Sequence, residues 1–146
     1  MLHGHTIRLP PRGYLKMHPP YSQPALIAVG AALGALLRWQ LGLRFNPLFA
    51  QFAFGTWLAN LLGCLLAGAV LGLLLAGRPL AQPLQNALAV GFLGSLTTFS
   101  ALSGEVSERL LNKQWLPAGL ILALHTVCGI AATLLAAAAV QRLIKG

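Results

Sequence analysis

One stretch of the chain concentrates residues that could hold an ion, although it lies inside a long apolar segment. Residues 91–105 read GFLGSLTTFSALSGE and combine glycines, hydroxyl side chains and one carboxylate, Glu105. Glycines and threonines weaken a helix, so backbone carbonyls and hydroxyls become available to a bound ion. At membrane depth, irregular backbone and an ionisable group are tolerated where they line a cavity or are buried in protein. The stretch is therefore a candidate ion site.

The composition of the chain is that of an integral membrane protein. It is 57% hydrophobic and 8% charged, with a mean hydropathy of +0.74, whereas soluble domains carry about 25% charged residues. The net charge is +8, and the basic residues lie at the ends of apolar segments, which is typical of membrane topology and not of nucleic-acid binding. Cys64 and Cys128 lie in apolar segments without metal-ligand spacing, so we expect small buried residues and no disulfide framework.

Four apolar segments are long enough to cross a bilayer, since about 20 helical residues span a hydrocarbon core of about 30 Å. We expect them at residues 24–43, 54–76, 84–111 and 116–144, with a break in the third at the candidate ion site. Residues 1–23 are polar and proline-rich and are predicted to be a disordered tail, with Met17 as an alternative start. Residues 24–146 would then form an all-α transmembrane domain.

Small residues recur at four-residue steps on the first two segments. Gly30 and Gly34 form one such pair, and further glycines and alanines on the second segment form a ladder. Small residues let helix backbones approach closely, so we expect tight helix contacts on these faces.

Isolated polar groups on the apolar segments allow two interpretations each. Asn60 could join helices or present an N–H donor to an anion, and Arg38 could reach the interface or supply positive charge near a pore mouth. Glu105 stands four residues before Arg109, a spacing suited to an ion pair. His125 is a lone histidine in its segment, for which hydrogen-bonded packing is favoured over a proton relay.

Charge counting bears on orientation and assembly. With the N-terminus on side one, Arg78, Arg142 and Lys145 lie on side one, and Arg44, Arg109 and Lys113 lie on side two. This balance predicts a chain that inserts in both orientations. The tail adds Arg8, Arg12 and Lys16 to side one and would favour both termini in the cytoplasm. Four short helices enclose little polar space, so a homodimer is the natural way to build a pathway.

Three motifs in order resemble the CrcB/Fluc fluoride channels. They are GAALGALLRW at residues 30–39 followed by RFNP at 44–47, GTWLANLLGCLLAG at 55–68, and the stretch at 91–105, which is similar to the family pattern G-F-x-G-x-x-T-T-F-S-T-F-x-x-E. The resemblance implies an antiparallel, dual-topology dimer in the bacterial plasma or inner membrane. It implies passive export of fluoride from the cytoplasm, which lowers fluoride toxicity, and no enzymatic activity.

The resemblance also implies roles for individual residues. Backbone carbonyls of Gly94 and Thr97 would bind a structural sodium ion on the dimer axis. The fluoride pathway would be lined by Asn60, Thr98 and Ser100, with the ring edge of Phe99 facing the anion, Arg38 near a vestibule and Glu105 at the far end of a polar track.

Two positions depart from the family pattern. Leu102 and Ala101 stand where the family has phenylalanine and threonine. This leaves open a homodimer or a heterodimer with a sister subunit, in which this chain could be a non-conducting partner.

The residues argue against two rival functions. A small dual-topology cation exporter would need an acidic residue in its first helix, and residues 24–43 have none. A membrane scaffold would not explain the clustered polar residues at 91–105.

Overall fold

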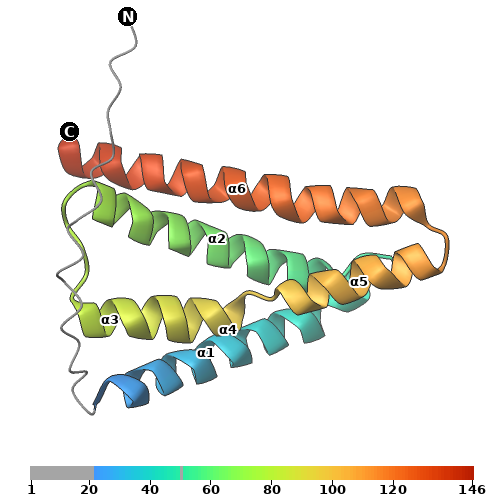
Figure 1. The fold of residues 1–146 in the computed structure, drawn as a ribbon, viewed down its shortest axis with the longest axis horizontal. Coiled ribbons are helices and arrows are strands. Elements are labelled where there is room, and N and C mark those ends of the chain that lie inside the picture. The colour runs from blue at the N-terminus through green and yellow to red at the C-terminus, as the bar shows by residue number, and fades with distance from the viewer. Residues whose placement is uncertain (1–21, 50) are drawn as a thin grey trace, which may run out of the picture.

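The computed structural model describes residues 22–49 and 51–146, and the regular elements in these ranges are all helical (Figure 1). The predicted tail lies outside the described residues up to position 21. The elements are α1 (Ser22–Phe45), the 3-10 turn η2 (Asn46–Leu48), α2 (Phe54–Leu75), α3 (Gln82–Asn86), the π-helix η3 (Ala87–Leu93), α4 (Gly94–Leu96), α5 (Phe99–Leu111) and α6 (Trp115–Lys145).

Four helical segments are long and apolar enough to cross a membrane, as the sequence predicted, and the chain is a multi-pass membrane protein. The first begins at Ser22, so the last residues of the predicted tail are already helical. The third is composite: α3, η3, α4 and α5 together cover the apolar stretch Gln82–Leu111. A π-helix such as η3 is rare and is frequently found at functional sites.

The helices pack as two pairs, and the last part of the third segment connects the pairs (Figure 1). α2 runs along α6, and α1 runs along η3 and α4, while α5 continues onto α6. The turn after α2 uses Gly77 with φ +73°, and Arg78 and Gly77 donate their N–H groups to the carbonyls of Leu73 and Leu74. This is a Schellman cap, which needs a left-handed residue and therefore favours glycine.

The predicted small-residue contacts are confirmed. A Cβ added at Gly34 would meet the Phe92 carbonyl, and one at Gly91 would meet the Ile27 carbonyl, so α1 and η3 touch through their backbones. On α2, a Cβ at Gly68 would meet the Thr133 backbone of α6. In lipid, no hydrophobic effect drives helices together, so their association depends on van der Waals packing. Close backbone approach increases that contact. These contacts hold η3 against α1 and α2 against α6.

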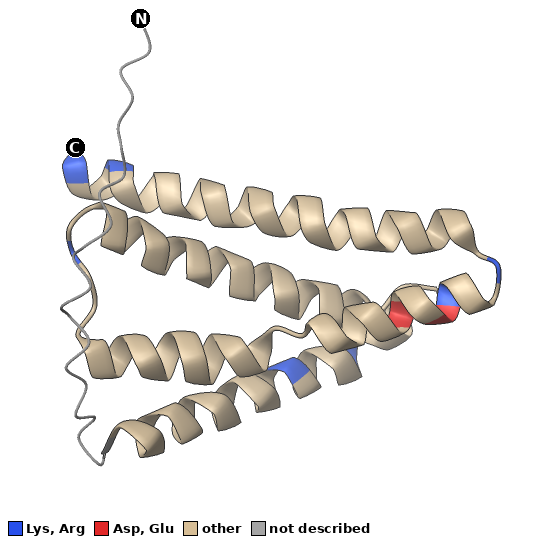
Figure 2. Cartoon of the chain, viewed as in Figure 1, with Lys and Arg blue, Asp and Glu red and all other residues tan. Residues whose placement is uncertain are grey.

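Charged residues lie largely toward the two ends of the bundle (Figure 2). Arg142 and Lys145 lie in the last turn of α6, and Arg44 and Arg109 lie in the last turns of α1 and α5. Cys64 and Cys128 are free thiols and are half-buried, not fully buried as expected.

Candidate functional site

Thr97 and Thr98 have extended backbone torsions between the helical segments α4 and α5. Their φ and ψ angles are −84° and 152° for Thr97, and −148° and 113° for Thr98. Both residues are β-branched, which lowers helix propensity and suits extended backbone. The irregular backbone falls at the two threonines of the candidate ion site.

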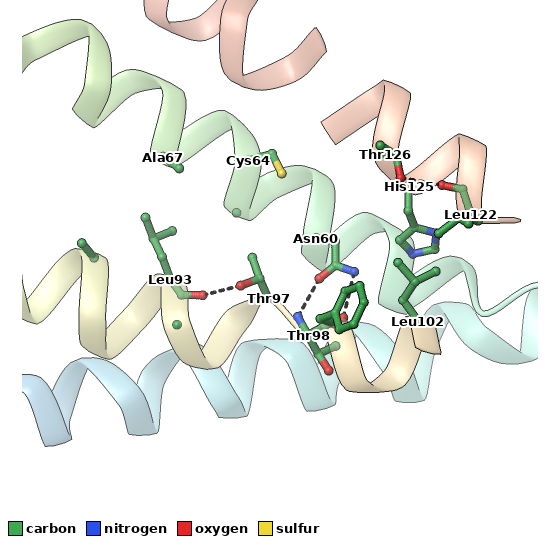
Figure 3. Close-up of a pocket in the computed structure, with 14 residues that line it drawn as sticks. Asn60, Cys64, Ala67, Leu93, Thr97, Thr98, Leu102, Leu122, His125 and Thr126 are labelled. Atoms are coloured by element: carbon green, nitrogen blue, oxygen red, sulfur yellow. Dashed lines mark hydrogen bonds between the residues drawn. The ribbon is translucent and has the colours of Figure 1, made fainter. Parts of the chain in front are cut away.

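The side chain of Asn60 holds this extended backbone from the neighbouring helix α2. Its Oδ1 accepts a hydrogen bond of 2.7 Å from the Thr98 N–H, and its Nδ2 donates one of 3.3 Å to the Thr98 carbonyl (Figure 3). An amide side chain has one acceptor and two N–H donors, so this bracket leaves one Asn60 N–H uncommitted. Asn60 therefore joins helices, and it retains a donor beside the irregular backbone.

Thr98 caps the N-terminus of α5. Its Oγ1 accepts a hydrogen bond of 3.1 Å from the Ala101 N–H and lies 3.1 Å from the Ser100 Oγ. Threonine is a favoured N-cap residue because its hydroxyl satisfies a free N–H of the first turn. Thr97 differs, since its Oγ1 donates to the Leu93 carbonyl behind it at 2.9 Å.

These bonds release two carbonyls from their regular helical partners. In a continuous helix, the Thr98 N–H would donate to Gly94 and the Ala101 N–H would donate to Thr97. Both N–H groups are instead directed to side-chain oxygens, of Asn60 and of Thr98. The carbonyls of Gly94 and Thr97 are thus among those that lose their regular donors where α4 ends, and carbonyl oxygens are ligands that hard cations prefer.

A groove of about 570 Å³ runs between α2, the third segment and α6 beside this backbone (Figure 3). Asn60, Gly94, Thr97, Thr98 and Phe99 all line it. Phe99 is 78% exposed in the single chain, so its ring projects from the first turn of α5 and is free to meet a partner surface. Ser100 belongs to the same place through its contact with Thr98.

Two predicted pathway residues lie elsewhere. Glu105 lines a separate pocket of about 360 Å³, where its Oε1 accepts a hydrogen bond of 2.8 Å from the Ala53 N–H at the start of α2. Arg109 donates to Gln114 at 2.9 Å, so the structure gives both members of the suggested Glu105–Arg109 pair other partners. Arg38 lies on α1, outside the residues that line the groove.

The groove also contains two residues that the sequence analysis named but did not assign to the pathway. Leu102, buried on α5, and His125, buried on α6, both line it. The sequence carried no periodic signal for His125, because apolar residues surround α6 on all sides. The buried positions of α6 follow steps of three and four residues, which is the spacing of one helix face, and include Ala118, Ile121, His125, Gly129 and Ala132.

The chain is similar in sequence to known proteins of one family. Residues 25–137 match the family model described as CrcB-like protein, Camphor Resistance (CrcB). The chain is 50% identical over 109 residues to a fluoride-specific ion channel FluC of Haemophilus influenzae strain PittGG, covering 75% of this chain and 85% of the relative. It is 50% identical over 101 residues to the FluC of Pasteurella multocida, covering 69% and 78% of the two chains. The family match covers most of the chain, including every residue of the groove, and the chain therefore belongs to the CrcB-like family.

Proposed function

We propose that the chain is a subunit of a fluoride-selective channel that lets fluoride leave the cytoplasm passively. The observation that carries the proposal is the N-terminus of α5. It borders the groove, and hydrogen bonds from Asn60 and Thr98 hold the backbone there in its extended form. The relatives named fluoride-specific ion channel FluC support the choice of ion. A passive pathway requires no catalytic residues, so the proposed function is that of a non-enzymatic transporter.

The groups around this helix end suit a small anion. The first N–H groups of a helix have no intrahelical partner and carry a partial positive charge. Phe99 adds a ring whose edge is the positive end of its quadrupole, and the hydroxyls of Thr98 and Ser100 are potential donors. Fluoride is strongly hydrated, so a pore must replace its water by N–H and O–H donors. Asn60, with its uncommitted N–H, is a further donor of that kind.

The proposed pathway follows from the acid chemistry of fluoride. Hydrogen fluoride is a weak acid, so it crosses lipid in its neutral form and dissociates inside the cell. The trapped anion then needs a route outward, and a negative-inside membrane potential drives it without ATP. Arg38 and Glu105 lie outside the groove in the single chain, and we assign them to the vestibule and to the far end of the pathway.

We further propose that the extended residues Thr97 and Thr98 form a break in the third membrane helix that holds a structural sodium ion. The freed carbonyls of Gly94 and Thr97 would supply ligands, and the exposure of Gly94 on the single chain leaves room for a second set. The two proposed carbonyls of one chain fill only part of the oxygen shell of a hard cation. This shortfall supports an antiparallel dimer with the ion on its axis, embedded in the lipid bilayer.

The proposal is tested by fluoride efflux from liposomes that contain this purified chain alone, with chloride as the control anion. Fast efflux of fluoride without chloride is expected. A folded protein that passes no fluoride would overturn the proposal for the homodimer. Efflux restored by Leu102→Phe or Ala101→Thr would locate the defect at the departures from the family pattern and favour a heterodimer.

Sodium is tested separately from conduction. Replacing sodium by N-methylglucamine during purification should lower the thermal stability of the dimer and slow fluoride efflux, and returned sodium should restore both. Thr97→Ala keeps the backbone carbonyl and should keep the response to sodium. Equal stability with and without sodium would remove the ion from the proposal and leave the fluoride pathway standing.

A further inference from the structure

A histidine lies in the wall of the groove and takes no part in the pathway described so far. His125 projects from α6, is 9% exposed, and lines the groove together with Asn60 and Leu102. Figure 3 shows its imidazole extending from α6 toward the side of the groove where those two residues lie. A histidine in a membrane helix is costly to bury, and one that faces a cavity is a candidate for a functional role.

The hydrogen bonding of the ring fixes which nitrogen carries the proton. The His125 Nδ1 lies 3.1 Å from the Ile121 carbonyl, one turn earlier on α6. A carbonyl can only accept, so Nδ1 donates, and the neutral ring carries an unprotonated lone pair on Nε2. Nε2 is buried and has no hydrogen-bond partner among the described residues. The ring therefore presents an unsatisfied acceptor when neutral and a second N–H donor when protonated.

Among the described residues that line the groove with His125, none is a carboxylate that would pair with an imidazolium. Of the residues that line the groove, Cys64 of α2 is the other titratable one. The ring of Phe52 stands edge-on to His125, with centroids 6.0 Å apart and planes at 70°. The charged residues of α5, which are Glu105, Glu108 and Arg109, line a different pocket on which Phe52 also borders.

We propose that Nε2 of His125 is an anion subsite of the groove that forms on protonation, so that the channel binds and conducts fluoride faster in mild acid. This inference rests on the proposed fluoride pathway through the groove. The neutral ring turns a lone pair toward the anion and repels it. The imidazolium instead offers a charge-assisted N–H donor, which is shorter and stronger than a neutral one. Hydrogen fluoride that enters a cell releases protons, so such a subsite would act when fluoride accumulates.

The first test measures the imidazole itself. A variant in which the tail histidines His3, His5 and His18 are replaced by Gln retains His125 as its one histidine, since the chain has four. ¹⁵N spectra of this protein in liposomes at one fixed, mildly acidic pH should show a larger protonated fraction in sodium fluoride than in sodium chloride. Binding and protonation must favour each other reciprocally. An unchanged fraction would overturn the inference.

The second test measures flux. Fluoride efflux by the wild-type chain should rise at least about threefold between about pH 7.5 and about pH 5.5, the range in which histidine changes charge. His125→Gln should abolish the rise, whereas Cys64→Ala, which removes the other titratable group of the groove, should keep it. Protein-free liposomes correct for hydrogen fluoride that crosses the lipid.

The two tests separate this inference from the proposed function. A wild-type chain that conducts fluoride equally at both pH values overturns the subsite and leaves the channel intact. A chain that conducts no fluoride at any pH overturns the channel. The imidazole spectrum still decides whether His125 responds to fluoride in that case, and it does not depend on how well His125→Gln folds.

Discussion

Asn60 shows how one side chain can perform two tasks at a membrane site. Its amide satisfies both the N–H and the carbonyl of Thr98, which the extended backbone would otherwise leave unpaired in an apolar environment. A buried polar group without a partner costs about 1–3 kcal/mol. The same amide retains one N–H beside the groove. The two interpretations that the sequence left open for Asn60 are therefore compatible with each other.

Asn60→Asp should reduce fluoride efflux at least about tenfold. The carboxylate can still accept from the Thr98 N–H, but it loses the donor to the Thr98 carbonyl and adds a negative charge to the groove. A unit charge at about 5 Å repels an anion by about 3 kcal/mol at an effective dielectric constant of about 20. Efflux from liposomes measures the effect. Asn112→Asp, at the exposed end of α5, is the matched control and should conduct normally; equal rates for the two variants would exclude Asn60 from the pathway.

Thr98→Val should remove the N-cap of α5 at nearly constant volume. The cap bond to the Ala101 N–H is lost, which costs about 0.5–2 kcal/mol of the free energy of unfolding, and the freed N–H can return to the Thr97 carbonyl. We expect a lower unfolding temperature in detergent and a weaker response to sodium. Thr98→Ser retains the hydroxyl and should behave like the wild type. Valine and serine variants of equal stability would contradict the capping role.

At the scale of the helices, apolar length was sufficient to predict the four membrane-spanning segments. The four membrane-spanning segments begin and end within a few residues of their predicted positions, because a helix in lipid must be both long and apolar. The π-helix η3 was not predicted. Its sequence, ALAVGFL, is uniformly apolar and does not distinguish a π-helix from an α-helix. The bracket between Asn60 and Thr98 joins residues 38 positions apart, and no local pattern encodes that contact.

The contact between α2 and the extended backbone depends on a pair of small groups. A Cβ added at Gly63 would meet the Cγ2 methyl of Thr97. Gly63→Ala should therefore destabilise the protein by about 1–3 kcal/mol, the usual cost of overpacking. Thr97→Ser removes that methyl and keeps the hydroxyl that donates to Leu93, so the double variant should recover most of the lost stability.

Thermal unfolding of the single and double variants measures this coupling. Gly119→Ala is the control for the substitution itself, because a Cβ added at Gly119 meets no atom within 4 Å. Alanine is also the better helix former by about 1 kcal/mol, so this control should be unchanged or more stable. Additive losses in the double variant would show that the two positions do not share one space.

At the scale of the whole molecule, the distribution of charge bears on how two copies can meet. The ends of the bundle carry equal numbers of basic residues when the tail is left aside: Arg78, Arg142 and Lys145 at one end, and Arg44, Arg109 and Lys113 at the other. An antiparallel dimer requires both orientations in one membrane, or a sister chain of the opposite orientation. Balanced ends favour the first case, because orientation follows the excess of Lys and Arg in short loops.

The tail should decide between these two cases. Arg8, Arg12 and Lys16 raise one end of the molecule to six basic residues against three, so the full chain should insert mainly with both termini in the cytoplasm. Replacing these three residues by Gln should yield both orientations. A C-terminal fusion to green fluorescent protein reports a cytoplasmic end, and a fusion to alkaline phosphatase reports an external one.

Replacing the tail histidines His3, His5 and His18 by Gln changes the tail without changing its lysine and arginine count, and this control should keep the orientation of the full chain.

A full chain that already inserts both ways would mean that the tail does not act on topology, and a homodimer would then form without a sister chain. A full chain fixed in one orientation would require an oppositely oriented sister chain. Co-expression of the full chain with the Arg8, Arg12 and Lys16 variant should then restore antiparallel pairs and fluoride efflux, which the full chain alone would lack.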